Sequence, residues 1–335
     1  MPITVHSFAI SSHSSNGTLK IMKKIYIRVP DHQRRGRFQA LGSALVGSIL
    51  SPAYYLLASI YGAPGLRFRA CCAFLGLRLL YNRKGAVSYA DVYRLLFAPM
   101  DSVRYFEFDF IWRALSETPI RRFLDVSSPR LFPVMLLNER REIAGDLINP
   151  DERDLQTTAG LVKACGLDSR CRLLDCRIEH APFASESFDA ITTISVVEHI
   201  PQDREAIKKI WALLRPGGKL LITVPCGAVA EEEYTNVDFF GLQTPDESGF
   251  FFHQYRYDRS LLEDRFYSVT GSPAQLAIYG EKKAGTLLSG LLKKWSGQRY
   301  PLWKEPYVIA RKFQRYETLS DLPGEGVIAM EFIKK

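Results

Sequence analysis

The feature that most constrains the fold is a regular alternation of apolar strands and amphipathic helices between residues 121 and 226. Each strand candidate is a short run rich in Leu, Ile, Val and Phe. Each helix candidate repeats its apolar residues at the 3.6-residue period. This alternation predicts an α/β fold, with a doubly wound, mostly parallel sheet that carries helices on both faces.

The expected strands, in chain order, are RRFLDV, REIAGDL, CRLLDC, FDAITTISVV and KLLITVP. The helix QDREAIKKIWALL has its apolar residues on one face, and Gly217 and Gly218 are expected to end it. The connections between these elements are short, so one compact α/β domain is expected.

The rest of the chain divides into parts of different composition. Residues 1–22 are polar and lack the basic start and apolar centre of a signal peptide, so we expect a disordered leader. Residues 23–99 predict a helical, apolar N-terminal extension, and residues 100–335 the α/β domain. Within that domain we expect an inserted aromatic segment at about 227–258 and a basic amphipathic segment at about 282–299.

Residues 38–66 contain no charged residue, a length that would suffice to span a bilayer. Pro52, in the middle of the run, instead favours two helices that meet near it. Three interpretations stay open for this run: packing against the main domain, an interfacial membrane element, or a span. For 282–299, whose apolar helical face is flanked by lysines, both a lipid headgroup interface and a core-packed helix remain possible.

The formal net charge of +8 favours an anionic neighbour, such as a membrane surface, a nucleic acid or a phosphorylated substrate. The six cysteines include no CxxC pair, which indicates reduced thiols. We therefore expect a cytoplasmic protein with no metal site. Attachment to an anionic membrane surface on the cytoplasmic face is the open alternative.

The most specific stretch is IEHAPFASESFDAITTISVVEHIPQDREAIKKIWALLRPGGKLLITVP. It combines a Pro-Phe turn, a Phe-Asp strand start, a Glu-His-Ile strand end and an Arg-Pro-Gly-Gly-Lys-Leu turn. In these motifs, residues from about 120 to 226 resemble a class I, seven-stranded, Rossmann-like methyltransferase that depends on S-adenosylmethionine. The resemblance implies S-adenosyl-L-methionine as cofactor, and transfer of its methyl group to a small-molecule, sugar or lipid acceptor.

Two aspartates are expected at the carboxyl edge of the sheet, where α/β domains of this type bind ligands. Asp125 closes the first strand, and Asp146 lies 21 residues later, at the expected end of the second. This spacing is close to the ~20 residues at which an acidic side chain reaches ribose hydroxyls. A role for Asp146 as the N-cap of the following helix is the alternative.

The turn after Asp125 departs from the family pattern Asp-x-Gly-x-Gly-x-Gly. Ser127 and Ser128 are small and can donate hydrogen bonds, so they are expected to replace glycine in part. Pro129 cannot donate its backbone nitrogen.

Two further cofactor contacts are expected. On the adenine side, Arg177 stands where the resembled family has an aspartate, so Asp175 is the candidate substitute. Arg104, just before the first strand, is placed to bind the methionine carboxylate. A plain ion pair is the alternative for Arg104.

Glu198 and His199 follow the fourth strand and are the candidate catalytic residues. Methyl transfer to a hydroxyl requires removal of a proton, and the pKa of histidine suits a general base near neutral pH. A structural hydrogen bond to a neighbouring loop is the alternative role for His199.

The sequence leaves two function classes to compare with an active small-molecule methyltransferase. A catalytically inactive binding or scaffold protein of the same fold is the main alternative, because the cofactor turn is irregular. No nucleic-acid partner is expected, because the fourth strand ends in SVVEHI and not in the Asn-Pro-Pro-Tyr type of motif that holds a flipped base.

Overall fold

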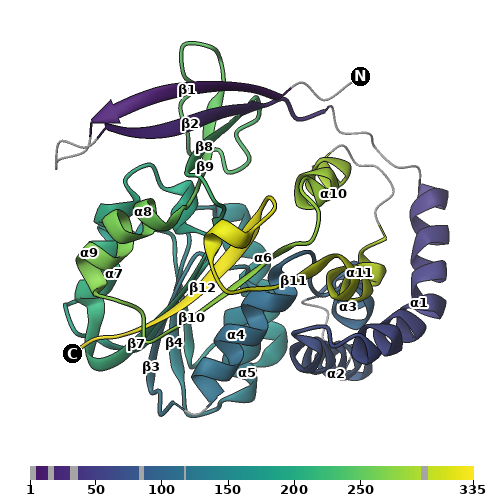
Figure 1. The fold of residues 1–335 in the computed structure, drawn as a ribbon. Coiled ribbons are helices and arrows are strands. Elements are labelled where there is room, and N and C mark those ends of the chain that lie inside the picture. Colours follow the sequence, from purple (N-terminus) through teal and green to yellow (C-terminus); the bar gives the residue numbers. More distant parts are fainter. Residues whose placement is uncertain (1–4, 14–18, 31–36, 83–86, 117, 296–300) are drawn as a thin grey trace.

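The computed structural model describes residues 5–13, 19–30, 37–82, 87–116, 118–295 and 301–335. In these ranges the strands form two separate sheets (Figure 1). The main sheet consists of β3 (Arg122–Val126), β4 (Ala144–Ile148), β5 (Cys171–Leu174), β6 (Phe188–Ile194), β7 (Leu214–Cys226), β10 (Gln275–Glu281), β11 (Phe313–Tyr316) and β12 (Gly326–Ile333). The smaller sheet consists of β1 (Val5–His13), β2 (Leu19–Ile27), β8 (Glu231–Thr235) and β9 (Phe251–Arg256).

The helices surround the main sheet. They are α1 (Arg37–Ile60), α2 (Leu66–Asn82), α3 (Tyr89–Phe97), α4 (Arg104–Ser116), α5 (Leu131–Glu139), α6 (Glu152–Cys165), α7 (Asp203–Leu213), α8 (Arg259–Leu262), α9 (Ser268–Thr270), α10 (Thr286–Trp295) and α11 (Glu305–Lys312). Short turns η1 (Ile178–His180), η2 (Val197–His199) and η4 (Leu302–Lys304), and the π-helical turn η3 (Glu263–Tyr267), lie between them.

The main sheet has the order β11-β10-β12-β7-β6-β3-β4-β5. The block from β7 to β5 is parallel, whereas β12, β10 and β11 pair antiparallel at the other side. The predicted doubly wound, mostly parallel α/β fold is thus confirmed. Within the described residues the sheet has eight strands and not seven, because β11 pairs with the outer side of β10.

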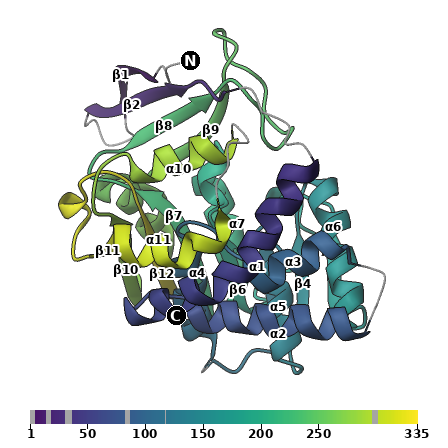
Figure 2. The same cartoon turned by 90° about the vertical axis from the view of Figure 1, so that its right-hand side faces the viewer.

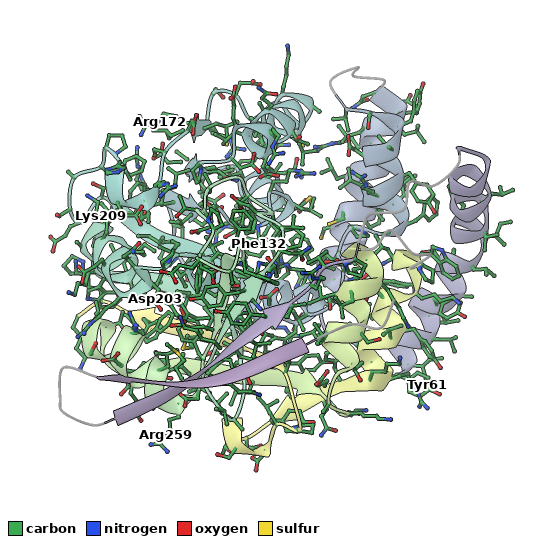
Figure 3. All side chains as sticks on the ribbon, turned by 90° about the horizontal axis from the view of Figure 1, so that it is seen from above. Tyr61, Phe132, Arg172, Asp203, Lys209 and Arg259 are labelled. Carbon is green, nitrogen blue, oxygen red and sulfur yellow. The ribbon has the colours of Figure 1, made fainter. Side chains whose placement is uncertain are left out.

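Alternating strand residues build a core on each face of the main sheet. Phe123 packs with residues of α2 to α6, and its neighbour Leu124 packs on the opposite face with residues of α7 and α8. Phe132 is fully buried and lies in the middle of the molecule when seen from above (Figure 3). Both faces are therefore covered, as expected for a sheet with near-continuous apolar strands.

The N-terminus differs from the expectation of a disordered leader over 1–22. β1 and the first part of β2 lie in that range and form an antiparallel hairpin, while residues 1–4 and 14–18 lie outside the described residues. β2 then extends to Ile27, inside the range expected to be helical. Its other partner is β8, which it pairs in parallel with Lys23 opposite Glu231. Because β8 is so distant in sequence, the residue pattern around β2 does not reveal it as the partner strand.

The apolar run at 38–66 forms one helix and a turn. Helices were predicted to meet near Pro52, but α1 includes Pro52 and ends at Ile60. The chain turns instead at Gly62 and Gly65, which adopt φ values of +69° and +70°. Among the helices of the described ranges, none combines the length and apolar character needed to cross a bilayer.

The amphipathic segment at 282–299 forms α10, and the protein itself covers the apolar face of that helix. Leu292 is buried against Ile25 and Ile27 of β2, and Leu287 packs against the main core. Lys294 forms ion pairs with Asp101 at 2.9 Å and with a buried glutamate of α11 at 3.1 Å. These contacts agree with the core-packed interpretation. Residues 296–300 lie outside the described part of the chain.

Candidate active site

A pocket of about 350 Å³ lies at the carboxyl edge of the parallel strands. Its walls come from segments that follow three of these strands: 126–129 after β3, 149–151 after β4 and 195–196 after β6. Residues 199–202 and part of the β8–β9 connection complete it. Its volume is in the range of small-molecule sites, roughly 300–1,000 Å³.

Asp125 supports the turn after β3 through hydrogen bonds and is not part of the pocket wall. Its carboxylate accepts hydrogen bonds from the backbone N–H of Ser128 at 3.0 Å and from the Thr192 hydroxyl at 2.6 Å. Burial raises the pKa of Asp125 to about 6. Asp125 thus holds the turn in place, and it does not itself line the pocket.

Ser127 and Ser128, in the turn that lacks the glycines of the family pattern, line the pocket. Ser127 adopts a φ of +52°, in the left-handed region that glycine usually supplies. Its hydroxyl donates to the carbonyl of Ile148 at 3.1 Å, and the hydroxyl of Ser128 accepts from the N–H of Ile194 at 3.0 Å. The turn thus reaches a glycine-like conformation with serines whose hydroxyls are bound to adjacent strands.

Asp146 does not lie where the sequence predicted. β4 continues two residues beyond it, so Asn149 is the residue that reaches the pocket. The carboxylate of Asp146 is paired with Arg122 at 3.0 Å and with Arg172 at 2.7 Å, and Arg172 lies at the outer edge in Figure 3. The N-cap alternative is also wrong, because Asp151 caps α6.

Three residues after β4 place side-chain oxygen atoms in the pocket wall, namely Asn149, Asp151 and Asp154. Asn149 donates its side-chain N–H to Asp154 at 3.0 Å and accepts the backbone N–H of Asp151 at 2.9 Å. Asp154 also pairs with Arg130. All three line the pocket, and the local pattern that could have revealed them is the polar run NPDERD directly after an apolar strand.

Asp175 is exposed and does not line the pocket, so it is not the expected adenine contact. The residues that do line it there are Arg177, Ile178 and Glu179, at the start of η1. Arg177 donates to the carbonyl of Leu242 at 3.4 Å, which connects this wall to the β8–β9 connection.

Arg104 lines the pocket and also forms the ion pair that was the alternative role for it. It contacts Glu107 at 2.6 Å, and Glu107 is fully buried. Glu107 accepts hydrogen bonds from the hydroxyls of Ser195 at 2.6 Å and Thr223 at 2.8 Å. The start of α4 is thereby fixed to the carboxyl ends of β6 and β7.

His199 lines the pocket as a neutral imidazole. Its Nδ1 lies 2.6 Å from the carbonyl oxygen of His253, so Nδ1 carries the proton and Nε2 carries the lone pair. Burial lowers the pKa of His199 to about 4. Its ring also packs against Phe240, with the centroids 4.9 Å apart.

Glu198 lies behind this wall and does not line the pocket. Burial raises the pKa of Glu198 to about 8, so the carboxyl is protonated at neutral pH. Its Oε1 is 3.9 Å from Nε2 of His199, beyond hydrogen-bond distance. The structure therefore brings both candidate catalytic residues together but exposes only His199 to a ligand.

Oppositely charged side chains of the pocket lie on the two sides of the turn after β3. Arg104 is fixed beside the ends of β6 and β7, while Asp151 and Asp154 follow β4. In the sheet β3 lies between β6 and β4. A ligand that spans the turn thus meets a cation on one side and carboxylates on the other.

A family of domains and a curated protein match part of this chain in sequence. Residues 146–222 match the model of a family described as a methyltransferase domain. Methyltransferase GfsG of Streptomyces halstedii is 31% identical over 74 residues, which are 22% of this chain and 27% of that protein. The chain thus covers about a quarter of the length of this curated relative.

Solved structures of similar shape include geranyl diphosphate C-methyltransferase from Streptomyces coelicolor A3(2), in complex with Mg²⁺, geranyl diphosphate and S-adenosyl-L-homocysteine. It has a TM-score of 0.45 and 12% identity, covering 73% of this chain and 82% of that one. The YcgJ protein of Bacillus subtilis has a TM-score of 0.45 and 12% identity, covering 69% of this chain and 98% of that one.

The cofactor of this methyltransferase family is S-adenosylmethionine, and the pocket residues fit its parts. The guanidinium of Arg104 suits the methionine carboxylate, because arginine binds carboxylates through paired hydrogen bonds. The carboxylates of Asp151 and Asp154 suit the ribose hydroxyls, and the buried Ile178 suits the adenine face. Residues 146–222 thus match a methyltransferase domain, and the motifs of the chain resemble those of the class I, Rossmann-like methyltransferases that depend on S-adenosylmethionine.

Proposed function

We propose that this protein transfers a methyl group from S-adenosylmethionine to a hydroxyl oxygen of an apolar small-molecule or lipid acceptor. The observation that carries the proposal is the position of His199. Its neutral imidazole lines the same pocket as the Ser127–Pro129 turn and the carboxylates after β4. A proton acceptor thus lies in the same cavity as the residues that suit the cofactor.

The pocket residues divide into a binding group and a reacting group. Arg104, Asp151 and Asp154 hold and orient the cofactor, whose sulfonium supplies an activated methyl carbon when it is bound. The protein then has to place the acceptor oxygen in line with that carbon and to exclude water. Ser127 contributes by letting the backbone approach the ligand closely.

His199 is suited to take the proton of the acceptor hydroxyl. The hydroxyl proton passes to Nε2 of His199 while the new carbon–oxygen bond forms and the carbon–sulfur bond breaks, leaving S-adenosylhomocysteine. The hydrogen bond to the His253 carbonyl fixes the tautomer with its lone pair on Nε2. Because burial lowers the pKa of His199 to about 4, the imidazole is unprotonated and able to accept at neutral pH.

The acceptor side of the pocket supports an apolar ligand. Ile200, Pro201, Phe240 and Leu242 line it, and the last two come from the β8–β9 connection. Gln243 of the same connection donates to the backbone carbonyl of His199 at 3.3 Å. The connection therefore closes over the residue proposed as the base.

Calorimetry with S-adenosylhomocysteine tests the cofactor half of the proposal. Methyl transfer from tritiated S-adenosylmethionine into fractionated apolar and polar extracts tests the acceptor half. Binding of the nucleoside together with label in an apolar fraction is the expected result. An intact protein that binds no S-adenosylhomocysteine would instead point to the inactive binding or scaffold protein.

The His199→Ala variant tests the base. We expect turnover to fall by about 10² to 10⁴, with affinity for S-adenosylhomocysteine nearly unchanged. The pH dependence of turnover in His199→Gln, compared with that in the intact protein, distinguishes a role of His199 in proton removal from a role in packing alone. A variant that loses cofactor affinity together with turnover would assign His199 a structural role.

A further inference from the structure

The polar and apolar faces of α1 are exchanged relative to those of a surface helix in a soluble protein. Such a helix normally turns its apolar stripe to the core and its polar residues to water. In α1 the inward side carries serine, tyrosine and glycine, and the outward side carries leucine, isoleucine and valine.

The inward side of α1 is held by polar contacts. Ser51 accepts a hydrogen bond from the buried guanidinium of Arg69 at 2.7 Å, and the same guanidinium donates to the Phe97 carbonyl at 3.1 Å. Tyr55 donates to the carbonyl of Leu66 at 3.3 Å. These bonds fix α1 to α2 and to the end of α3.

Aromatic residues complete the inward contact. The ring of Tyr54 lies 5.2 Å from that of Trp303 in η4 and 5.5 Å from that of Tyr307 in α11. Gly47 allows this approach, because a Cβ atom there would lie 2.3 Å from the Tyr93 hydroxyl and 2.7 Å from the Trp303 ring. The orientation of α1 is therefore set by specific packing.

The outward side of α1 is a continuous apolar stripe, here called the α1 face. Ile49 is 67% exposed and Ile60 is 70% exposed, near the two ends of the stripe. Figure 2 shows α1 in front of the rest of the molecule, and Tyr61 lies at the outer edge in Figure 3. Its exposed large apolar members are Leu45, Val46, Ile49, Leu50, Leu56, Leu57 and Ile60, and the half-exposed Tyr61 follows directly after the helix.

Helix α2 adds exposed aromatic and aliphatic side chains next to this helix. Phe74 is 72% exposed and Tyr81 is 89% exposed, and Leu77 lies between them on the same helix. Arg67 and Arg78 are exposed on α2 as well. Isolated apolar residues on a surface need no explanation, but a contiguous patch of this kind marks an interaction site.

The excess positive charge of the chain lies in the same stretch of sequence as the α1 face. Residues 32–90 contain eight basic residues and no aspartate or glutamate. Outside that stretch the acidic and basic residues are equal in number, so the stretch accounts for the whole net charge of +8. The α1 face thus belongs to the cationic stretch of the chain, residues 32–90.

The geometry points to the surface of an anionic lipid bilayer as the occupant of the α1 face. Protein interfaces carry about one hydrogen bond per 100–200 Å², whereas the side chains exposed on α1 in the described range include no charge and, of hydroxyls, only Ser59. Hydrocarbon requires no such bonds. A helix of this kind lies in the plane of the interface, with its apolar side about 5–10 Å deep and basic residues at the headgroups.

Vesicle flotation tests this inference, which does not depend on the proposed catalytic function. The probes are vesicles of phosphatidylglycerol and phosphatidylcholine, with vesicles of phosphatidylcholine alone for comparison. We expect the intact protein to float with the anionic vesicles and much less with the neutral ones. Binding should weaken as salt is raised, because the Debye length falls below about 10 Å above 0.1 M ionic strength.

Matched charge variants locate the contact. The double variant Ile49→Glu with Ile60→Glu places two carboxylates on the α1 face, and we expect its binding to anionic vesicles to fall by about tenfold or more. The control is Val229→Glu with Leu276→Glu, which adds the same charge at positions 55% and 47% exposed on other elements. The control is expected to bind like the intact protein. Thermal unfolding of both variants verifies that the fold is kept.

Three outcomes would overturn the inference. The first is an intact protein that stays in the soluble fraction with anionic vesicles at low salt. The second is an equal loss of binding in the two double variants. The third is a dimer in analytical ultracentrifugation that does not float and that Ile49→Glu with Ile60→Glu converts to a monomer, because a second copy of the chain would then cover the α1 face.

Discussion

At the residue level, the site contains two buried groups whose pKa values are shifted far from their ordinary values. Glu198 keeps its proton at neutral pH, because burial raises its pKa to about 8. His199 stays neutral, because burial lowers its pKa to about 4. The pair therefore places no net charge beside Arg104 and Glu107, whose own ion pair is buried in the same region.

Glu198 makes the stability of the protein depend on pH. Between its ordinary pKa of 4.5 and the folded value of about 8, the unfolded chain loses this proton while the folded chain keeps it. The free energy of unfolding therefore falls as pH rises through this window, by at most about 1.4 kcal/mol per pH unit. Glu198→Gln removes the effect, so the stability of the variant relative to the intact protein is expected to rise with pH.

Urea unfolding between about pH 5 and pH 8 measures that difference. Glu205→Gln is the matched control, because Glu205 is an exposed carboxylate of α7 paired with Lys208 at 2.7 Å. The difference in free energy of unfolding between Glu198→Gln and the intact protein should change with pH. If it changes no more than the corresponding difference for Glu205→Gln, Glu198 is not protonated in the folded protein.

Two variants compare Asp154, which lines the pocket, with Asp146, which the sequence predicted as a cofactor contact. Asp154→Asn removes a pocket carboxylate, and we expect affinity for S-adenosylhomocysteine to fall by about tenfold, the usual scale for a charged hydrogen bond. Asp146→Asn disturbs only the ion pairs with Arg122 and Arg172, so affinity should stay nearly constant. Calorimetry of the two variants checks this, and a larger loss for Asp146→Asn would restore the sequence-based prediction.

At the scale of elements, the turn between α1 and α2 positions α4 and with it Arg104. Gly62 and Gly65 both adopt positive φ in this turn. A Cβ atom on Gly65 would lie 2.3 Å from the backbone carbonyl of Tyr105, whereas nothing lies within 4 Å of one on Gly62. The two glycines therefore share a backbone requirement but differ in packing.

Alanine substitutions separate these two effects. Gly62→Ala is expected to lower the free energy of unfolding by about 1 kcal/mol, from the backbone conformation alone. Gly65→Ala adds the clash with Tyr105, so its loss should exceed that of Gly62→Ala by about 1–3 kcal/mol. Urea unfolding of the pair measures the gap, and equal losses would mean that α2 and α4 separate at little cost.

The parallel strands could be predicted from the sequence because their information is local. β3, β6 and β7 are apolar runs bounded by turn residues, and the helices between them show their own period. The error at Asp146 arose from a strand boundary, since β4 ends at Ile148, two residues beyond Asp146. The β1–β2 hairpin was missed because the strand that supports it, β8, lies about 200 residues further along the chain.

At the scale of the whole molecule, the N-terminal hairpin and the pocket are connected through the smaller sheet. β2 pairs with β8, and the backbone N–H of Val29 donates to the side chain of Asn236 at 2.6 Å. Asn236 opens the β8–β9 connection, whose Phe240 and Leu242 line the pocket. A strand at the start of the chain thus supports the wall over the proposed acceptor.

A truncated protein that begins at residue 37 tests this connection. It lacks β1 and β2, exposes the edge of β8, and removes Ile25 and Ile27 from their contact with Leu292. We expect a lower thermal midpoint and weaker binding of S-adenosylhomocysteine, because Arg177 and Leu242 would lose their fixed geometry. Undiminished affinity in a folded truncated protein would show that the β8–β9 connection keeps its position alone.

The pairing of β2 with β8 also determines when the protein can finish folding during its synthesis. Lys23 and Glu231 are 208 residues apart, so at about 5–20 residues per second β2 waits on the order of 10–40 s for its partner to leave the ribosome. During that time its edge is open to wrong partners, and Lys23 and Lys24 provide charges of the kind that discourage such pairing. The same lysines later meet Glu231 at 3.3 Å and Glu232 at 3.6 Å. The nascent chain therefore protects its first strands with the charges that afterwards select β8.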